Sequence, residues 1–165
     1  MNINKLKEPY ILVLIGPPLV GKSTWIRENF ISKDIDVNVI SRDQLVMDLY
    51  GSDDYNKAFK EVNQKEVNDM LERSFIEASK NGDNVIVDMT NLTSKRRKST
   101  LNYFGDEYQK VAVIFPPVDW EEIKRRNEKR EREEQKTIPD HVIKNMLSSY
   151  QPVKEEEGFD KIVSI

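Results

Sequence analysis

The stretch YILVLIGPPLVGKSTWIREN, residues 10–29, decides how the chain is expected to fold. It runs from an apolar segment through a glycine-rich turn into residues with helical character. Residues 16–23 fit the pattern G-x-x-x-x-G-K-[ST], in which backbone amides and a helix N-terminus surround a phosphate group. An ordinary glycine-rich turn is the alternative. The strand before the pattern and the helix after it favour the phosphate-binding loop.

Each residue of this loop has an expected role. Gly16 and Gly21 let backbone amides turn toward the β-phosphate, and Lys22 is expected to bridge the β- and γ-phosphate oxygens of ATP. The hydroxyl of Ser23 is the expected Mg²⁺ ligand. The other expected nucleotide contacts are Pro17, Pro18, Val20 and Thr24.

The fold class follows from short apolar runs separated by helical segments. The runs lie at 10–15, 36–40, 84–88, 110–115 and 161–165. They lack polar alternation, which is typical of strands buried on both faces of a parallel sheet. Helices are expected at 44–50, at 55–80, from 94 to about 104 after a Thr93 cap, and after Pro139. We therefore expect one domain, residues 1–165, with a three-layer α/β/α fold and a five-stranded, mainly parallel sheet.

Composition narrows the function classes. The 165 residues include no cysteine, which excludes disulfides and thiolate metal sites, and His141 is the only histidine, which argues against a zinc site. A net charge of −3 does not favour nucleic-acid binding unless basic residues gather locally. No apolar run approaches the roughly 18 residues of a membrane span, and residues 1–10 lack the apolar core of a signal peptide. A cytoplasmic protein without a membrane role is expected, and its oligomeric state is open.

A carboxylate follows the second predicted strand, in the segment SRDQL at 41–45. Ligands of such sheets bind at the carboxyl ends of strands, so Asp43 would face the γ-phosphate, with Arg42 beside it on the substrate side. Asp43 could take the proton of an attacking hydroxyl. The alternative is that Asp43 only caps the helix 44–50.

The third predicted strand ends in a second carboxylate, within NVIVDMTNLT at 84–93. Asp88 could hold Mg²⁺, directly or through water, or organise the substrate side of the site. Thr90 and Asn91 are further candidates for substrate contact, although residues of these types more often shape a turn or cap the next helix.

A highly charged stretch, WEEIKRRNEKREREEQK, occupies residues 120–136. One interpretation is a solvated helix with pairs such as Glu122–Arg126. The other is a lid, at about 120–137, that brings an arginine to the transferring phosphoryl group. Arg126 and Arg130 lie one turn apart on the same face, so either could be the catalytic residue.

Four cations occur in SKRRKS, residues 94–99, in the first turns of a predicted helix. The helix dipole disfavours positive charge there, which suggests an anionic partner such as a nucleic-acid backbone. Arg97 is the candidate substrate contact. A surface helix carrying four cations needs no partner, and both interpretations stay open.

Taken together, the motifs resemble those of the kinase domain of phage-type polynucleotide 5′-kinases, within the small P-loop kinases. The resemblance covers GPPLVGKSTW, SRDQL, DMTNLTSKRRK and KRRNEKR with IPDHVIKNM, nearly the whole chain. It implies transfer of the ATP γ-phosphate to the 5′-hydroxyl of a DNA or RNA end, as in nucleic-acid repair. It also implies that Lys22 and Ser23 hold ATP and Mg²⁺, that Asp43 is the general base and that Arg130 is the lid arginine.

Two features depart from that family. Val46 stands where a basic residue often grips substrate phosphate, and the chain has no Asp-x-Asp-x-Thr motif of a fused 3′-phosphatase, so a kinase alone is expected. Two alternatives therefore remain. One is a kinase of the same fold for a small-molecule hydroxyl, and the other is a non-catalytic module that binds nucleotide to regulate a partner.

Overall fold

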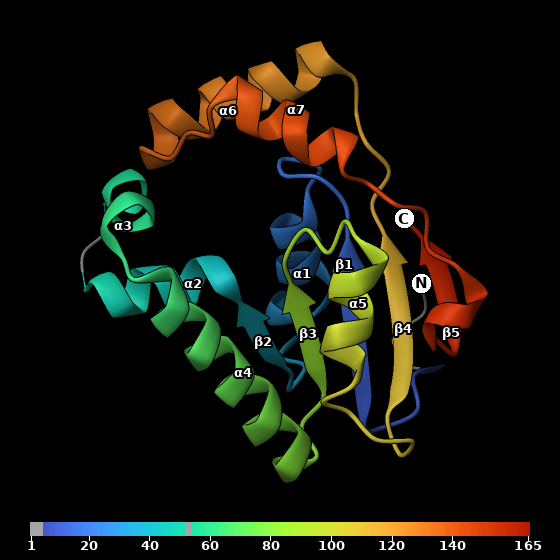
Figure 1. The fold of residues 1–165 in the computed structure, drawn as a ribbon. Coiled ribbons are helices and arrows are strands. Elements are labelled where there is room, and N and C mark those ends of the chain that lie inside the picture. Colours follow the sequence, from blue (N-terminus) through green and yellow to red (C-terminus); the bar gives the residue numbers. More distant parts are fainter. Residues whose placement is uncertain (1–4, 52–53) are drawn as a thin grey trace.

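A five-stranded parallel sheet forms the centre of the computed structural model, which describes residues 5–51 and 54–165 (Figure 1). Residues 1–4, part of the segment 1–10 that was considered for a signal peptide, lie outside the described residues. Every pair of neighbouring strands is parallel. The strand order is β2 (Asn38–Ser41), β3 (Val85–Asp88), β1 (Tyr10–Ile15), β4 (Gln109–Ile114) and β5 (Lys161–Ser164). This confirms the predicted fold class, and each observed strand overlaps one of the predicted apolar runs.

The central strand β1 is buried along its whole length because helices cover both faces of the sheet. One face, with Ile11 and Val13, packs against Phe75. The other face, with Leu12 and Leu14, packs against Phe30. Burial on both sides explains why the strand sequence carries no polar alternation.

The helices differ from the predicted ones mainly at one point. A single helix was expected over 55–80, but the structure has α3 (Tyr55–Glu61) and α4 (Gln64–Asn81). Val62 between them is extended, and the Asn63 side chain caps α4 by accepting a hydrogen bond from the Lys65 amide at 3.0 Å. The predicted single helix is therefore wrong. The five-residue step from Val62 to Val67, too long for one helical stripe, was the signal in the sequence.

The remaining helices position the site at the edge where the strands end. The α-helices are α1 (Lys22–Asn29), α2 (Arg42–Tyr50), α5 (Ser94–Leu101), α6 (Trp120–Glu134) and α7 (Asp140–Ser148), and short 3₁₀ helices occur at Ile31–Lys33 and Glu155–Glu157. The helix after Thr93 ends at Leu101, three residues earlier than predicted. Figure 1 shows α6 and α7 arching over the carboxyl ends of the strands toward α3.

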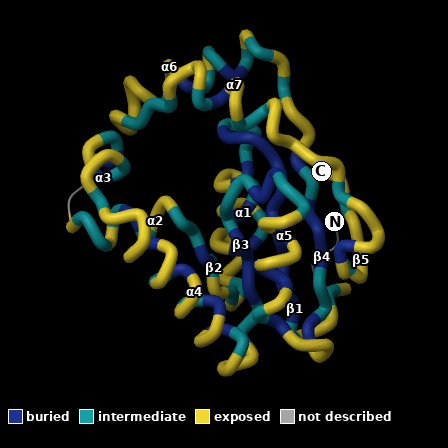
Figure 2. Tube along the Cα trace, viewed as in Figure 1, coloured by how far each residue is buried: buried dark blue, intermediate teal, exposed yellow. Residues whose placement is uncertain are grey.

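Burial is uneven between the sheet and this arch. Figure 2 shows the central strands β3, β1 and β4 mostly buried, whereas α6 and α7 are largely exposed or half-buried. Ile123 and Asn127 are the buried residues of α6, and Ile143 is that of α7. Of the helices in the described part of the chain, none is both long and apolar enough to span a membrane.

Candidate functional site

The predicted phosphate-binding loop connects β1 to α1. Gly21 has φ 100°, a left-handed conformation that side chains disfavour. A Cβ on Gly16 would lie 2.7 Å from the carbonyl oxygen of Phe115, too close for any other residue. Pro17 and Pro18 are buried, whereas Thr24 is exposed. The two glycines are therefore required by the backbone, for different reasons.

Lys22 lies almost buried at the start of α1, with 9% of its surface exposed. Its ammonium donates hydrogen bonds to the carbonyl oxygens of Gly16, at 3.0 Å, and Pro17, at 2.7 Å. Burial lowers the pKa of Lys22 to about 8, and the charges of Asp88 and Asp43 partly oppose that shift. The ammonium at the start of α1 suits an anionic ligand at this loop, and the two carboxylates favour its charged form.

Ser23 and Asp88 face each other beside Lys22. The Ser23 hydroxyl donates to Asp88 Oδ2 at 3.4 Å, from the first turn of α1 to the end of β3. Burial raises the pKa of Asp88, the charge of Asp43 adds to this, and Lys22 opposes it. Among the residues described, no group of three or more histidine and carboxylate side chains could hold a metal. A hydroxyl with one carboxylate nevertheless fits Mg²⁺, which takes few protein ligands and completes its shell with phosphate oxygens and water.

Asp43 is exposed in the first turn of α2. The cap of that helix is Ser41, whose side chain accepts from the Gln44 amide at 3.5 Å, so the alternative of Asp43 as the helix cap is wrong. The parallel pairing of Ser41 with Asp88 sets the ends of β2 and β3 side by side. Asp43 therefore lies across the same sheet edge from the phosphate-binding loop, where a carboxylate can meet an incoming alcohol.

Tyr55 is a site residue that sequence analysis missed. Its hydroxyl donates to Asp43 Oδ2 at 3.1 Å, and its ring lies 5.3 Å from the Arg130 guanidinium and 5.4 Å from the Lys136 ammonium. The sequence showed only an apolar position in a helical stripe. Nothing in that pattern distinguishes a buried phenol bonded to the carboxylate of Asp43 from an ordinary core tyrosine.

Both candidate lid arginines reach the site from α6. Arg126 donates to the carbonyl oxygen of Leu19 in the loop at 2.8 Å and to Glu122 at 2.6 Å, which confirms the predicted Glu122–Arg126 pair. Arg130 lies over the Tyr55 ring and pairs with Glu134 at 3.6 Å. Its charge acts on Lys22, so it lies near the bound phosphates' expected position.

Arg97 is the main correction to the predicted site. Its side chain is fully buried and makes a two-pronged ion pair with Glu157, at 2.6 and 2.7 Å. It also donates to the carbonyl oxygen of Asn91 at 3.0 Å. The expectation that Arg97 contacts substrate is therefore wrong: α5 turns this cation inward, against the segment before β5.

Asn91 shapes the loop rather than lining the substrate side, whereas the substrate contact expected of Thr90 stays a prediction. Asn91 is 2% exposed, has φ 46°, and its side-chain amide donates to the carbonyl oxygen of Leu14 at 2.8 Å. The expected substrate contact of Asn91 is thus wrong. The carbonyl oxygen of Thr90 accepts from the Gly16 amide at 3.0 Å, which ties the two loops together.

Arg42, the neighbour of Asp43 in α2, has a second arginine close to it. Arg42 is half-buried and donates to the Gln64 side chain. Burial lowers the pKa of Arg42, and the nearby charge of Arg96 acts in the same direction. Arg96, exposed in α5, is therefore close to Arg42, although it was not among the predicted site residues. The pair forms a local positive region despite the negative net charge.

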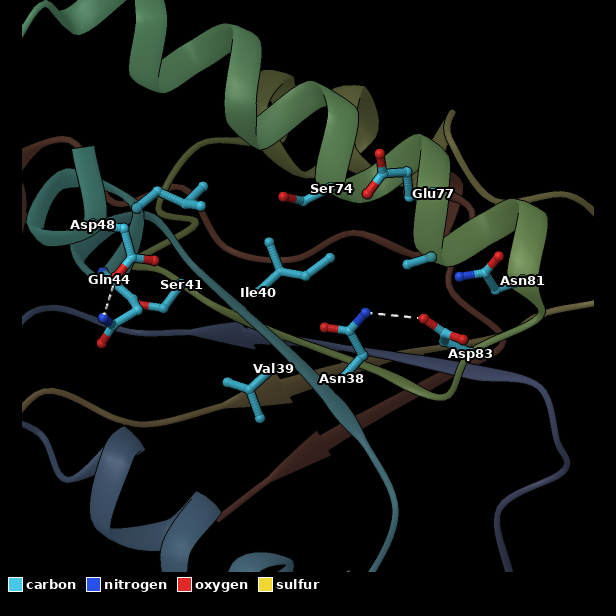
Figure 3. Close-up of a pocket in the computed structure, with 12 residues that line it drawn as sticks. Asn38, Val39, Ile40, Ser41, Gln44, Asp48, Ser74, Glu77, Asn81 and Asp83 are labelled. Atoms are coloured by element: carbon cyan, nitrogen blue, oxygen red, sulfur yellow. Dashed lines mark hydrogen bonds between the residues drawn. The ribbon is translucent and has the colours of Figure 1, made fainter.

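A separate hollow lies between β2 and α4 and contains no residue of the phosphate-binding loop (Figure 3). Two pairs of its polar side chains are hydrogen-bonded to each other. Asn38 donates to Asp83 at 2.9 Å, and Gln44 donates to Asp48 at 2.7 Å. We do not place the reaction there, because the cations that would attract a phosphate lie at the strand ends.

Comparison with known proteins agrees with this geometry. The family model described as an AAA domain matches residues 11–153. An L-seryl-tRNA(Sec) kinase of Methanococcus maripaludis is 26% identical over 145 residues, which cover 85% of this chain and 52% of that protein. The chain therefore spans about half the length of this curated relative.

Solved structures give the same picture. A chain of the Pnkp1/Rnl/Hen1 RNA repair complex is 26% identical, with a TM-score of 0.68 over 90% of this chain and 46% of that one. Kti12 of Chaetomium thermophilum, solved with ADP-AlF3, is 15% identical, with a TM-score of 0.64 over 94% of this chain and 88% of that one. The second likeness shows the fold alone. The specific resemblance to phage-type polynucleotide kinases stays a prediction.

Proposed function

The chain belongs to the AAA domain family, and we propose that this P-loop kinase domain transfers the γ-phosphate of ATP to the 5′-hydroxyl of a polynucleotide end. One observation carries the proposal. The buried Lys22 and the Ser23–Asp88 pair lie at the carboxyl ends of β1 and β3. The exposed carboxylate of Asp43 follows β2, further along the same edge of the sheet. Such an arrangement separates a donor side from an acceptor side.

On the donor side, the loop would hold the triphosphate. Its backbone amides and the N-terminus of α1 favour phosphate oxygens, and Lys22 would exchange its carbonyl partners for the β- and γ-phosphates. Ser23 and Asp88 would hold Mg²⁺, which supplies charge neutralisation of the phosphates when bound. Arg130 would approach the transferring group from the lid, because its pair with Glu134 is long, at 3.6 Å. Arg126 is held more closely, at 2.6 Å by Glu122 and at 2.8 Å by Leu19.

On the acceptor side, Asp43 would accept the proton of the alcohol. The alcohol oxygen then forms a bond to the γ-phosphorus, the bond from the γ-phosphorus to the bridging oxygen breaks, and ADP leaves. The remaining negative charge of the acceptor would lie near Arg42 and Arg96. A polynucleotide 5′ end presents a hydroxyl with a phosphate group nearby. Arg42 and Arg96 would bind that phosphate in place of the basic residue that is replaced by Val46.

The names of two relatives support an acceptor connected with RNA, since one is a kinase of seryl-tRNA and another belongs to an RNA repair complex. A kinase for a small hydroxyl compound is the competing proposal, and the same site chemistry would serve it. A nucleotide-binding regulator is the third, and it would not need the exposed carboxylate.

Phosphate transfer from γ-labelled ATP tests the proposal directly. A 5′-hydroxyl oligonucleotide, of DNA and of RNA, should become labelled, and its 5′-phosphorylated counterpart should not. A panel of small hydroxyl metabolites forms the parallel arm. Labelling of a metabolite alone would replace the polynucleotide acceptor, and labelling of neither, with ATP still bound, would favour the regulator.

A further inference from the structure

We propose that Tyr55 is a positioning residue that couples the lid to Asp43, with its hydroxyl holding the carboxylate and its ring receiving two lid cations. The proposal rests on the role of Asp43 proposed above. Tyr55 begins α3, which lies between α2 and the far end of the lid (Figure 1). The residue is 8% exposed, so its contacts are made from a fixed place.

The hydroxyl fixes one oxygen of Asp43. It donates to Oδ2 at 3.1 Å, which leaves the other carboxylate oxygen for an acceptor hydroxyl. Burial, and secondarily the charge of Asp43, raises the pKa of the Tyr55 phenol. Tyr55 therefore keeps its proton at any working pH and acts as a hydrogen-bond donor. It orients the carboxylate and takes no proton from the substrate.

The ring forms the second half of the coupling. The Arg130 guanidinium and the Lys136 ammonium both lie within the distance at which a cation is attracted to an aromatic face. Phe59, one turn along α3, supports the ring with its centroid 4.9 Å away. The two cations come from α6 and from the segment after it, so the ring contacts the lid at two points.

The backbone of the lid is fastened to α3 at the next residue. The Asn56 amide group donates to the carbonyl oxygen of Gln135 at 3.1 Å and accepts from the Thr137 amide at 3.3 Å. One turn of α3 therefore holds the end of the lid through Asn56 and holds Asp43 through Tyr55. We infer that the carboxylate is fully oriented when the lid is down, which links the acceptor side to closure over ATP.

Two variants separate the hydroxyl from the ring. Tyr55→Phe removes the hydrogen bond to Asp43 and keeps the ring, so kcat should fall about tenfold or more while the KM for ATP stays unchanged. Tyr55→Leu removes both, so it should also lose the protection that Mg·ATP gives α6 against trypsin. Tyr50→Phe is the matched control, because Tyr50 likewise donates to a carboxylate, Glu61 Oε2 at 2.9 Å, outside the site.

The outcomes divide clearly. If Tyr55→Phe has the kcat of Tyr50→Phe, or if Tyr55→Leu keeps Mg·ATP protection of α6, the coupling is overturned while the kinase activity stands. If the unaltered protein transfers phosphate to no acceptor, the proposed function fails, and the coupling to a catalytic carboxylate fails with it. Reduced kcat in Tyr55→Phe with normal lid protection, together with lost protection in Tyr55→Leu, supports it.

Discussion

The phosphate-binding loop and helix α6, which we propose to be a lid, meet at one site but are held there in different ways. The loop is part of the core: a buried strand precedes it, Phe115 packs on Gly16, and Thr90 bonds the Gly16 amide. The lid reaches the site through polar contacts, from Arg126 to Leu19 and from Asn56 to the end of α6. The turn between α6 and α7 is also held by polar groups, since the Asn127 side chain bonds the backbone amide and carbonyl oxygen of Ile138.

This difference suggests that the loop binds the ligand in a fixed conformation and that α6 moves. Apolar packing gives the loop one conformation, which suits a site that must present preorganised donors to a triphosphate. Helix α6 buries little beyond Ile123 and Asn127, and an element with few buried apolar contacts opens more readily, which suits closure around a ligand. Substitutions in the loop should therefore act on binding and chemistry together, whereas substitutions in the lid should act on turnover.

Among the loop, lid and core variants, the largest effect is expected from the lid arginine. Arg130→Ala should lower kcat by about three orders of magnitude, because an arginine at the transferring phosphoryl group stabilises the charge of the transition state to that extent. The melting temperature should hardly change. Arg132→Ala, exposed on the same helix, is the control in the same steady-state assay. Equal kcat values for the two variants would remove Arg130 from the mechanism.

Lys22→Met should act on both binding and rate. Loss of the ammonium should lower transfer by about two to three orders of magnitude, as for other preorganised charge-stabilising donors. It should also weaken Mg·ATP binding measured by calorimetry. Lys33→Met, at an exposed position beyond α1, should leave both unchanged. Retained ATP affinity in Lys22→Met would show that the loop does not bind the triphosphate.

Arg97 tests the core side of the comparison. Arg97→Ala leaves Glu157 buried without its partner and should lower the free energy of unfolding by about 3–5 kcal/mol. Urea denaturation measures this loss. Lys98→Ala, exposed on the same helix, should stay within about 0.5 kcal/mol of the original protein. A stable Arg97→Ala protein with impaired transfer would restore the substrate role that the structure contradicts.

The smallest effect concerns pH. Burial lowers the pKa of Lys22 to about 8, and phosphate binds the protonated ammonium. The affinity for Mg·ATP should thus be level below that pH and fall by up to about tenfold per pH unit above it. Calorimetry across a pH series measures the profile. Lys22→Arg, whose guanidinium stays charged, should give a level profile, and a level profile in the unaltered protein would contradict the assigned pKa.

How much could be predicted from the sequence follows the same division. The loop, the strands and the strand-end carboxylates Asp43 and Asp88 were predictable because local spacing encodes them. The inward turn of Arg97 was not, because its partner Glu157 lies 60 residues away. Tyr55 was missed for a similar reason. Its function depends on α2 and the lid meeting α3, and only the tertiary structure brings them together.

We propose that Asp43 takes the proton of the acceptor alcohol beside the triphosphate site. Asp43→Asn keeps the size of the side chain and an oxygen that can accept from Tyr55, but it removes the base. Transfer to a 5′-hydroxyl oligonucleotide should fall by about two to four orders of magnitude, while Mg·ATP affinity stays the same. Undiminished transfer by Asp43→Asn would contradict the account.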